Sequence, residues 1–206
     1  MSKKMYNVHI LIKGGIYMLE IRWHGRGGQG AKTASLLLAD AAFNTGKYIQ
    51  GFPEYGPERM GAPITAYNRI DDKEIRLHCN IYNPDCVVVV DDSLLKTVDV
   101  TNGLKDNGNL IINTSKSVKE IKSLFPDFKG NVYVIDASQI SRDCLKANFP
   151  NTAMLAAVVK ITKIMTDEEL LDNMLGSFKH KFAKKPDVIE PNMLALQRGL
   201  KEVYGE

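Results

Sequence analysis

The sequence has few cysteines and no arrangement of them that would bind a metal. Its 206 residues include only Cys79, Cys86 and Cys144, which are widely spaced and form no Cys-x-x-C pair. An odd number of scattered cysteines is typical of reduced thiols in a cytoplasmic protein rather than of a disulfide framework. We therefore expect a cytoplasmic chain that carries no zinc or iron–sulfur site of its own.

Long hydrophobic runs are also absent. A membrane-spanning helix needs about 20 consecutive apolar residues, and no run in the sequence approaches that length. Residues 1–17 contain the short run Val-His-Ile-Leu-Ile, which is shorter than the roughly 7 to 15 residues of a signal peptide's apolar region. We expect no membrane contact and no export, and we expect residues 1–17 to be an extension before a true start at Met18, followed by a single domain over residues 18–206. Mass spectrometry of the native N-terminus tests this, and a peptide covering Tyr6 to Ile12 would contradict it.

The sequence lacks the features of a nucleic-acid-binding protein. The formal net charge is only +3, and aromatic residues make up 8% of the chain. No Lys/Arg run resembles a basic arm, and the aromatic residues show no pattern suited to base stacking. We therefore expect no nucleic acid among the partners.

Strand patterns alternate with helix patterns along the chain. This alternation predicts an α/β fold in three layers, with a mostly parallel, Rossmann-like sheet and helices on both faces. A turn at Asp71-Asp72-Lys73 predicts a small hairpin added to the sheet. The expected strands are Leu19–Trp23, Tyr48–Phe52, Ile64–Ile70, Glu74–Cys79, Cys86–Val90, Asn109–Asn113 and Asn131–Asp136, and the expected helices are Ala31–Phe43, Val118–Phe125, Ala137–Ala147, Thr152–Ile164, Asp167–Gly176 and Pro191–Tyr204.

A glycine-rich loop follows the first expected strand and leads directly into an apolar helix. Loops of this kind let the main chain approach an anion, and they leave the N-terminal amides of the next helix pointing at it. The spacing Gly25-x-Gly27-x-x-Gly30 fits the dinucleotide fingerprint. Positive side chains within and after the loop add to its attraction for anions. The candidate binding residues are Gly25, Arg26, Gly27, Gly28, Gln29, Gly30 and Lys32.

Two nucleotide sites compete with this interpretation. A triphosphate-binding loop needs Gly-x-x-x-x-Gly-Lys-Ser/Thr, but Gly30-Ala31-Lys32-Thr33 is one residue out of register, which disfavours ATP hydrolysis. A nicotinamide or flavin site expects an acidic residue at the end of the second strand, where this chain has Gln50-Gly51-Phe52. A self-contained NAD(P)- or flavin-binding oxidoreductase stays open as an alternative. So does a glycine loop that serves only to pack the first strand against its helix or to dock on a partner subunit.

A second unusual loop follows the second expected strand. Residues 51–63 contain three prolines and three glycines, which break both helical and strand periodicity. Long, stiff loops are usually functional, and we interpret this one as a partner surface. The side chains expected to face the partner are Glu54, Tyr55, Glu58 and Arg59.

Both loops are expected at the same edge of the sheet. In a doubly wound sheet, ligands bind beyond the carboxyl ends of the strands. The pair Asp91-Asp92 follows another expected strand and reaches the same edge, where its simplest role is to cap a short helix. His24 ends the first strand, and we interpret it as a structural hydrogen-bonding residue rather than a base.

Together the two loops carry a family resemblance. Ile21-Arg-Trp-His-Gly-Arg-Gly-Gly-Gln-Gly30 and Phe52-Pro-Glu-Tyr-Gly-Pro-Glu-Arg-Met-Gly-Ala-Pro63 resemble the gamma subunits of 2-oxoacid:ferredoxin oxidoreductases. The resemblance covers residues 18 to 204 and is greatest to the gamma subunits of the multi-subunit pyruvate enzymes. It implies a reversible oxidative decarboxylation in which coenzyme A accepts the acyl group and ferredoxin accepts the electrons.

The resemblance implies that the reactive groups lie on companion chains. Thiamine diphosphate, Mg and iron–sulfur clusters are expected on alpha, beta and delta subunits, and ferredoxin is expected to be reached through the complex. This chain would hold no cofactor and no catalytic residue, but it would help to form the coenzyme A entrance. It also lacks the Gly-Asp-Gly…Asn-Asn run typical of thiamine diphosphate sites. A purely structural scaffold, or a subunit for a branched-chain 2-oxoacid, 2-oxoglutarate or indolepyruvate, stays open.

Overall fold

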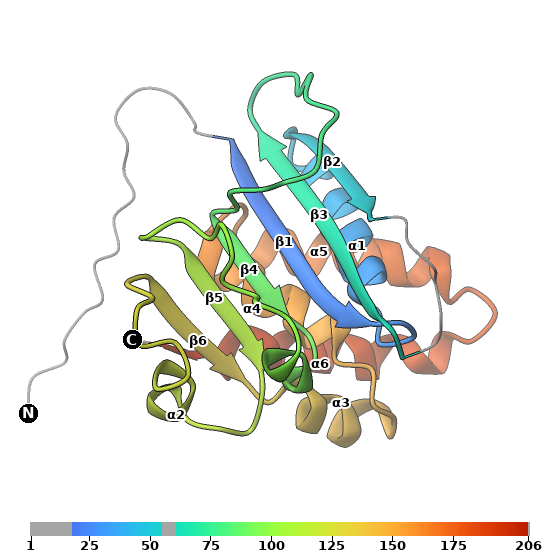
Figure 1. The fold of residues 1–206 in the computed structure, drawn as a ribbon. Coiled ribbons are helices and arrows are strands. Elements are labelled where there is room, and N and C mark those ends of the chain that lie inside the picture. The colour runs from blue at the N-terminus through green and yellow to red at the C-terminus, as the bar shows by residue number, and fades with distance from the viewer. Residues whose placement is uncertain (1–17, 55–60, 206) are drawn as a thin grey trace, which may run out of the picture.

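The computed structural model describes residues 18–54 and 61–205. Its strands form one seven-stranded sheet in the order β2-β3-β1-β4-β5-β6-β7 (Figure 1). They are β1 (Leu19–Arg26), β2 (Tyr48–Pro53), β3 (Pro63–Asp71), β4 (Cys86–Val89), β5 (Asn109–Asn113), β6 (Asn131–Ile135) and β7 (Tyr204–Gly205). Strands β1, β4, β5 and β6 run parallel to one another. Strand β3 is antiparallel to both β1 and β2, and β7 is antiparallel to β6.

Helices lie around the sheet. They are α1 (Ala31–Asn44), η1 (Asp92–Lys96), α2 (Val118–Lys122), α3 (Ala137–Leu145), α4 (Asn151–Thr162), α5 (Asp167–Lys181), η2 (Pro186–Val188) and α6 (Ile189–Lys201). Figure 1 shows α1, α4, α5 and α6 together on the far side of the sheet. The predicted α/β class, with a mostly parallel sheet core and helices around it, is confirmed.

Alternating side chains of the central strands build two separate cores. Val88 and Ile111 face the large helical layer, whereas Val87, Leu110 and Ile112 face the opposite side, where residues 94–104 and α2 cover them. Successive residues of a strand point to opposite faces, so a continuous apolar run such as Cys86–Val89 is what a strand covered on both faces requires. These strands fix the sheet edge at which the loops of interest emerge.

The predicted hairpin is wrong. Residues 74–79 form no strand, because both edges of β3 are already occupied, one by β1 and the other by β2. The segment is held instead by the side-chain amide of Gln50, whose Nε2 donates to Leu77 O at 2.9 Å and to Ile75 O at 3.4 Å. The antiparallel part of the sheet is therefore β2-β3-β1 rather than a local hairpin.

Element ends differ from the expected ones in a few other places. Strand β1 continues to Arg26, so Gly25 and Arg26 still pair with β3 and the connecting loop is reduced to residues 27–30. Helix α5 continues through Gly176 to Lys181. The sequence did not indicate β7. The proposed extension at residues 1–17 lies outside the described residues, and none of the helices in the described part of the chain is long and apolar enough to cross a membrane.

Candidate functional site

The predicted meeting of loops at one sheet edge is confirmed. The register pairs Arg26, at the end of β1, with Pro63, at the start of β3. The hydrogen bond from the Val90 N–H to His24 O, at 2.8 Å, continues the β1–β4 pairing to the same level. Helix α1 carries the chain from β1 toward β2 on one side, while β4 lies on the other side of β1. The edge between β1 and β4 is thus the switch point at which open α/β sheets bind ligands.

The glycine loop and the second loop are joined through their main chains. The Gly27 N–H donates to Ala62 O at 2.9 Å, and the Gly61 N–H donates to Gly27 O at 3.1 Å. Arg26 Nη1 adds a hydrogen bond to Gly61 O at 3.1 Å. The returning arm of the second loop is therefore fixed to the glycine loop by three hydrogen bonds.

Gln29 and Arg26 connect the glycine loop to the end of β4. Gln29 Oε1 accepts from the Arg26 N–H at 3.0 Å, and Gln29 Nε2 donates to Asp91 Oδ2 at 2.5 Å. Arg26 Nε lies 3.5 Å from Asp91 Oδ2, and its Nη2 donates to Ser93 Oγ at 3.0 Å. The structure thus brings together two predicted site residues and the predicted cap Asp91.

Asp91 caps η1, as the sequence indicated. Its Oδ1 accepts from the Ser93 N–H at 2.9 Å. Burial alone would raise the pKa of this carboxyl, but hydrogen bonds from Ser93 and Gln29 and the charge of Arg26 together lower it. Asp91 is therefore an anion at neutral pH, and it offsets part of the positive charge that Arg26 brings to the loop.

The start of α1 is formed by glycines in the left-handed region. Gly28 has φ +93° and is exposed. Gly30 is the N-cap of α1 and has φ +84°, and as a glycine it offers no side chain to cap the helix. A Cβ on Gly30 would lie 3.0 Å from Asn151, at the start of α4. Lys32 is exposed in the first turn of α1. Main-chain amides at a helix N-terminus favour an anion, so this corner has the geometry of an anion cradle.

A polar cavity of about 460 Å³ extends from Gln29 past the ends of β4, β5 and β6. Asn113, at the end of β5, donates to Val90 O at 2.8 Å and to Ser138 Oγ at 2.9 Å. Asp136, after β6, caps α3 by accepting from the Gln139 N–H at 2.8 Å. Sequence reasoning missed this cavity, although a polar residue directly after each buried strand was a usable signal. Other lining residues are Asp92, Thr114 and Arg142.

His24 lies beneath the loops as a buried hydrogen-bond acceptor. Its Nε2 accepts a hydrogen bond from Arg22 Nε at 3.0 Å. Arg22 Nη2 donates to Val100 O at 3.1 Å and to Asn102 O at 2.6 Å. Burial and the neighbouring Arg22 charge lower the pKa of His24 to about 4. The imidazole is therefore neutral at physiological pH. The interpretation as a structural hydrogen-bonding residue is confirmed.

Of the four side chains expected to face a partner, only that of Glu54 belongs to the described residues. Glu54 is exposed, and its Oε2 accepts from the Tyr67 hydroxyl at 2.9 Å. Tyr55, Glu58 and Arg59 lie outside the described residues, so their contact with a partner stays a prediction. Over residues 18–54 and 61–205, no three potential metal ligands from His, Cys, Asp and Glu lie together.

This architecture is an α/β domain with a glycine loop at the switch point of a mostly parallel sheet. Residues 20–202 match the family described as pyruvate ferredoxin/flavodoxin oxidoreductase, and the chain belongs to this family. The resemblance to gamma subunits noted from the two loops is confirmed by the comparisons with individual proteins.

Two relatives and one solved structure are similar over nearly their whole lengths. The common gamma subunit of the pyruvate/ketoisovalerate oxidoreductases of Thermococcus kodakarensis is 49% identical over 168 residues, covering 82% of this chain and 91% of that one. Pyruvate synthase subunit PorC of Thermotoga maritima is 46% identical over 184 residues, covering 89% and 94%. The crystal structure of the pyruvate oxidoreductase subunit PORC of Thermotoga maritima superposes with a TM-score of 0.80 at 42% identity, covering 92% of this chain and 98% of that one.

Proposed function

We propose that this chain is the gamma subunit of a pyruvate:ferredoxin oxidoreductase, or pyruvate synthase, complex. The complex would convert pyruvate, coenzyme A and oxidised ferredoxin to acetyl-CoA, CO2 and reduced ferredoxin. The observation that carries this proposal is the 46% identity to the Thermotoga maritima pyruvate synthase subunit over 94% of that protein's length. The similarity of the folds supports it.

The proposed complex divides the chemistry among its chains. Thiamine diphosphate, Mg and the iron–sulfur clusters would lie on alpha, beta and delta subunits in the cytoplasm, since such cofactors carry the difficult chemistry and a protein supplies binding and orientation. This chain would contribute to assembly and to the coenzyme A site, and by itself it would be inactive.

Residues 25–30 and Lys32 are our candidates for the coenzyme A phosphates. Gly28 is exposed and Gly30 allows a sharp entry into α1, so main-chain amides can approach a phosphate oxygen closely. Arg26 is held by Asp91, Ser93 and Gly61. In our proposal, Arg26 therefore orders the glycine loop and contributes part of its positive charge to the phosphate site. Glu54, Tyr55, Glu58 and Arg59 would face a neighbouring subunit.

A second candidate is a gamma subunit that serves more than one 2-oxoacid enzyme. The name of the Thermococcus kodakarensis relative describes a subunit common to pyruvate and ketoisovalerate oxidoreductases. Because we place the substrate contacts on other chains, a shared gamma subunit would need no change at its own site.

Native co-purification followed by activity assays tests the proposal. We expect the tagged chain to bring down two thiamine-binding chains and a ferredoxin-like chain, and the complex to reduce ferredoxin only when pyruvate and coenzyme A are both present. Activity with branched-chain 2-oxoacids through a second set of partners would identify the shared form. The isolated chain should bind no thiamine diphosphate and show no iron–sulfur absorbance. Tight binding of NAD(P) or a flavin by that chain, or its own turnover of an oxoacid, would overturn the proposal.

A further inference from the structure

The end of α5 and the turn after it carry a cluster of exposed positive side chains. Lys179, His180 and Lys181 lie in the last turn of the helix, and Lys184 and Lys185 follow in the turn. We call these five residues the basic patch. All of their side chains belong to residues that are exposed to solvent.

The patch dominates the charge balance of the chain. Removing its four lysines would lower the formal net charge from +3 to −1. Positive residues near a helix C-terminus interact favourably with the helix dipole, but that effect fades within the last turn, and Lys184 and Lys185 lie beyond it. Among the described residues, none of the four lysines forms an ion pair. The patch therefore presents concentrated positive charge that no ion pair within the described residues engages.

The core holds the patch in place. Phe178 is buried, its ring lies 5.7 Å from that of Phe182, and Lys181 Nζ lies 5.6 Å from the centre of the Phe182 ring. The Phe182 N–H donates to Phe178 O at 2.8 Å, and the Lys185 N–H donates to Phe182 O at 2.8 Å. The main chain of the patch is thereby held to the core, so less of it has to be ordered on binding than in a mobile tail.

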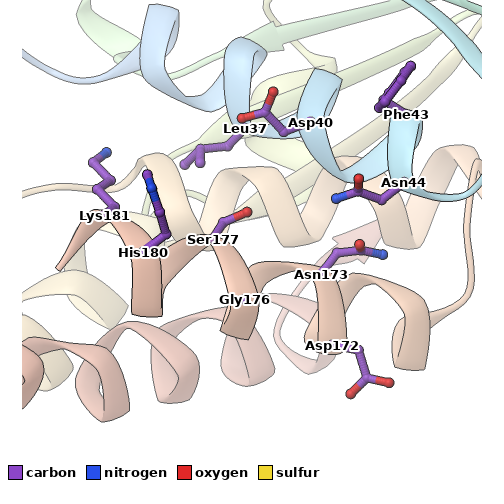
Figure 2. A pocket seen from close by; sticks show the side chains of 10 residues that line it. All are labelled: Leu37, Asp40, Phe43, Asn44, Asp172, Asn173, Gly176, Ser177, His180 and Lys181. Carbon is purple, nitrogen blue, oxygen red and sulfur yellow. The ribbon is translucent and has the colours of Figure 1, made fainter. Parts of the chain in front are cut away.

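A groove of about 520 Å³ between α1 and α5 adjoins the patch (Figure 2). Figure 2 shows His180 and Lys181 at one end of it and Asn173 beside Asn44 at the other. Phe43 of α1 is 68% exposed and lines this groove. On the α5 side, nothing lies within 4 Å of the position that a Cβ on Gly176 would occupy.

We propose that the basic patch and this groove bind an acidic segment of a neighbouring subunit of the same complex. Carboxylates of that segment would face the lysines, and one of its apolar side chains would cover Phe43. This inference rests on the proposed function, which places the chain in a hetero-oligomer. Charge complementarity identifies the partner, because clustered lysines attract an acidic protein surface and form ion pairs with it.

The groove favours a protein over a nucleic acid. Single-stranded nucleic acids are bound by aromatic platforms together with a basic track, whereas Phe43 is the exposed aromatic residue of this groove and Asp40 lies beside it. An apolar residue and a basic end together suit a peptide segment that has both acidic and apolar side chains.

The test compares charge reversal at the patch with charge reversal on another face. The variant is Lys184→Glu/Lys185→Glu, the matched control is Lys119→Glu/Lys129→Glu near α2, and Phe43→Ser tests the groove separately. Each purified full-length chain is titrated against the remaining subunits at low and high salt, after circular dichroism has confirmed folding. We expect binding about tenfold weaker for the patch variant and for Phe43→Ser at low salt, and the control within about twofold of wild type. Wild-type binding should also weaken at high salt.

Two results would overturn the inference while leaving the proposed function intact. One is assembly that is unchanged in both the patch variant and Phe43→Ser. The other is that the patch substitutions weaken only the binding of the chain to RNA, to anionic lipid vesicles or to a second copy of itself. Failure of the wild-type chain to associate with those subunits would instead overturn the proposed function.

Discussion

Gln29 Nε2 donates to Asp91 Oδ2 at 2.5 Å, which joins the loop after β1 to the loop after β4. The same amide accepts from the Arg26 N–H through its Oε1 at 3.0 Å. One side chain therefore spans the switch point and sets the path of the glycine loop. Because the second loop is bound to Gly27, the three segments at this edge form one connected unit.

Replacing Gln29 by Leu should loosen this unit. The change removes a donor to Asp91 and leaves the Arg26 amide without its side-chain acceptor, which should lower the free energy of unfolding by about 1–3 kcal/mol. The pKa of Asp91 should rise, since a hydrogen bond from Gln29 helps to keep it low. Urea unfolding and carboxyl NMR titration measure the two effects. Gln197→Leu, at an exposed glutamine of α6, is the control, and an unchanged Asp91 titration would contradict the role of Gln29.

Replacing Arg26 by Ala should affect acyl transfer to coenzyme A more than decarboxylation of pyruvate. The side chain orders the cradle through Gly61 and Ser93, and loss of charged hydrogen bonds costs about 1.5–3 kcal/mol. We expect the KM for coenzyme A of the assembled enzyme to rise about ten- to a hundredfold. Pyruvate decarboxylation without coenzyme A should change little.

Steady-state and single-turnover assays separate these steps. Arg76→Ala, at an exposed arginine paired with the exposed Glu74, should leave both unchanged. Equal loss of both steps would count against a coenzyme A role. If glycine-loop variants instead prevent assembly and leave coenzyme A affinity intact, the scaffold interpretation is correct.

The common edge of the three loops could be predicted because it follows from local patterns. Each loop comes directly after an apolar strand, and the carboxyl ends of parallel strands meet at one edge. The cap at Asp91 was equally local, since it depends only on Ser93 two residues later. The family resemblance likewise depended on two contiguous segments.

What could not be predicted depends on contacts between distant residues. The pattern at residues 74–79 is typical of a strand, but no sequence rule shows that β1 and β2 occupy both edges of β3. The link between Gln29 and Asp91 spans 62 positions. The basic patch was passed over because its lysines are interrupted by Phe182 and Ala183, and only the helix and turn bring them onto one exposed surface.

Two glycines of the loop should tolerate alanine differently. Both Gly28 and Gly30 have positive φ, so alanine at either should cost about 1 kcal/mol of backbone strain. A Cβ on Gly30 would also lie 3.0 Å from Asn151, whereas nothing lies within 4 Å of one on Gly28. We expect Gly30→Ala to be the more destabilising by about 1 kcal/mol or more. Parallel urea unfolding of the two variants measures this, and equal losses would show that Asn151 does not restrict the site.

The buried His24 should make the protein less stable as the pH falls below neutrality. In the folded chain its pKa is about 4, while in the unfolded chain it should be near the usual 6.5. Between these values the unfolded chain binds a proton that the folded chain excludes. The free energy of unfolding should therefore decrease as the pH falls from about 6.5 toward 4, by up to about 1.4 kcal/mol per pH unit from this group.

The variant His24→Asn isolates this contribution. Asparagine keeps an acceptor for Arg22 but has no titrating group, so its stability should fall less steeply over the same interval. Carboxylates titrate in both proteins, and subtracting the two urea-unfolding profiles removes their shared contribution. The difference should be flat above pH 7 and should shift in favour of the variant as the pH falls to 5. Parallel profiles from pH 7 to 5 would mean that His24 takes up a proton in the folded chain as readily as in the unfolded chain. Burial and Arg22 would then not keep the imidazole neutral.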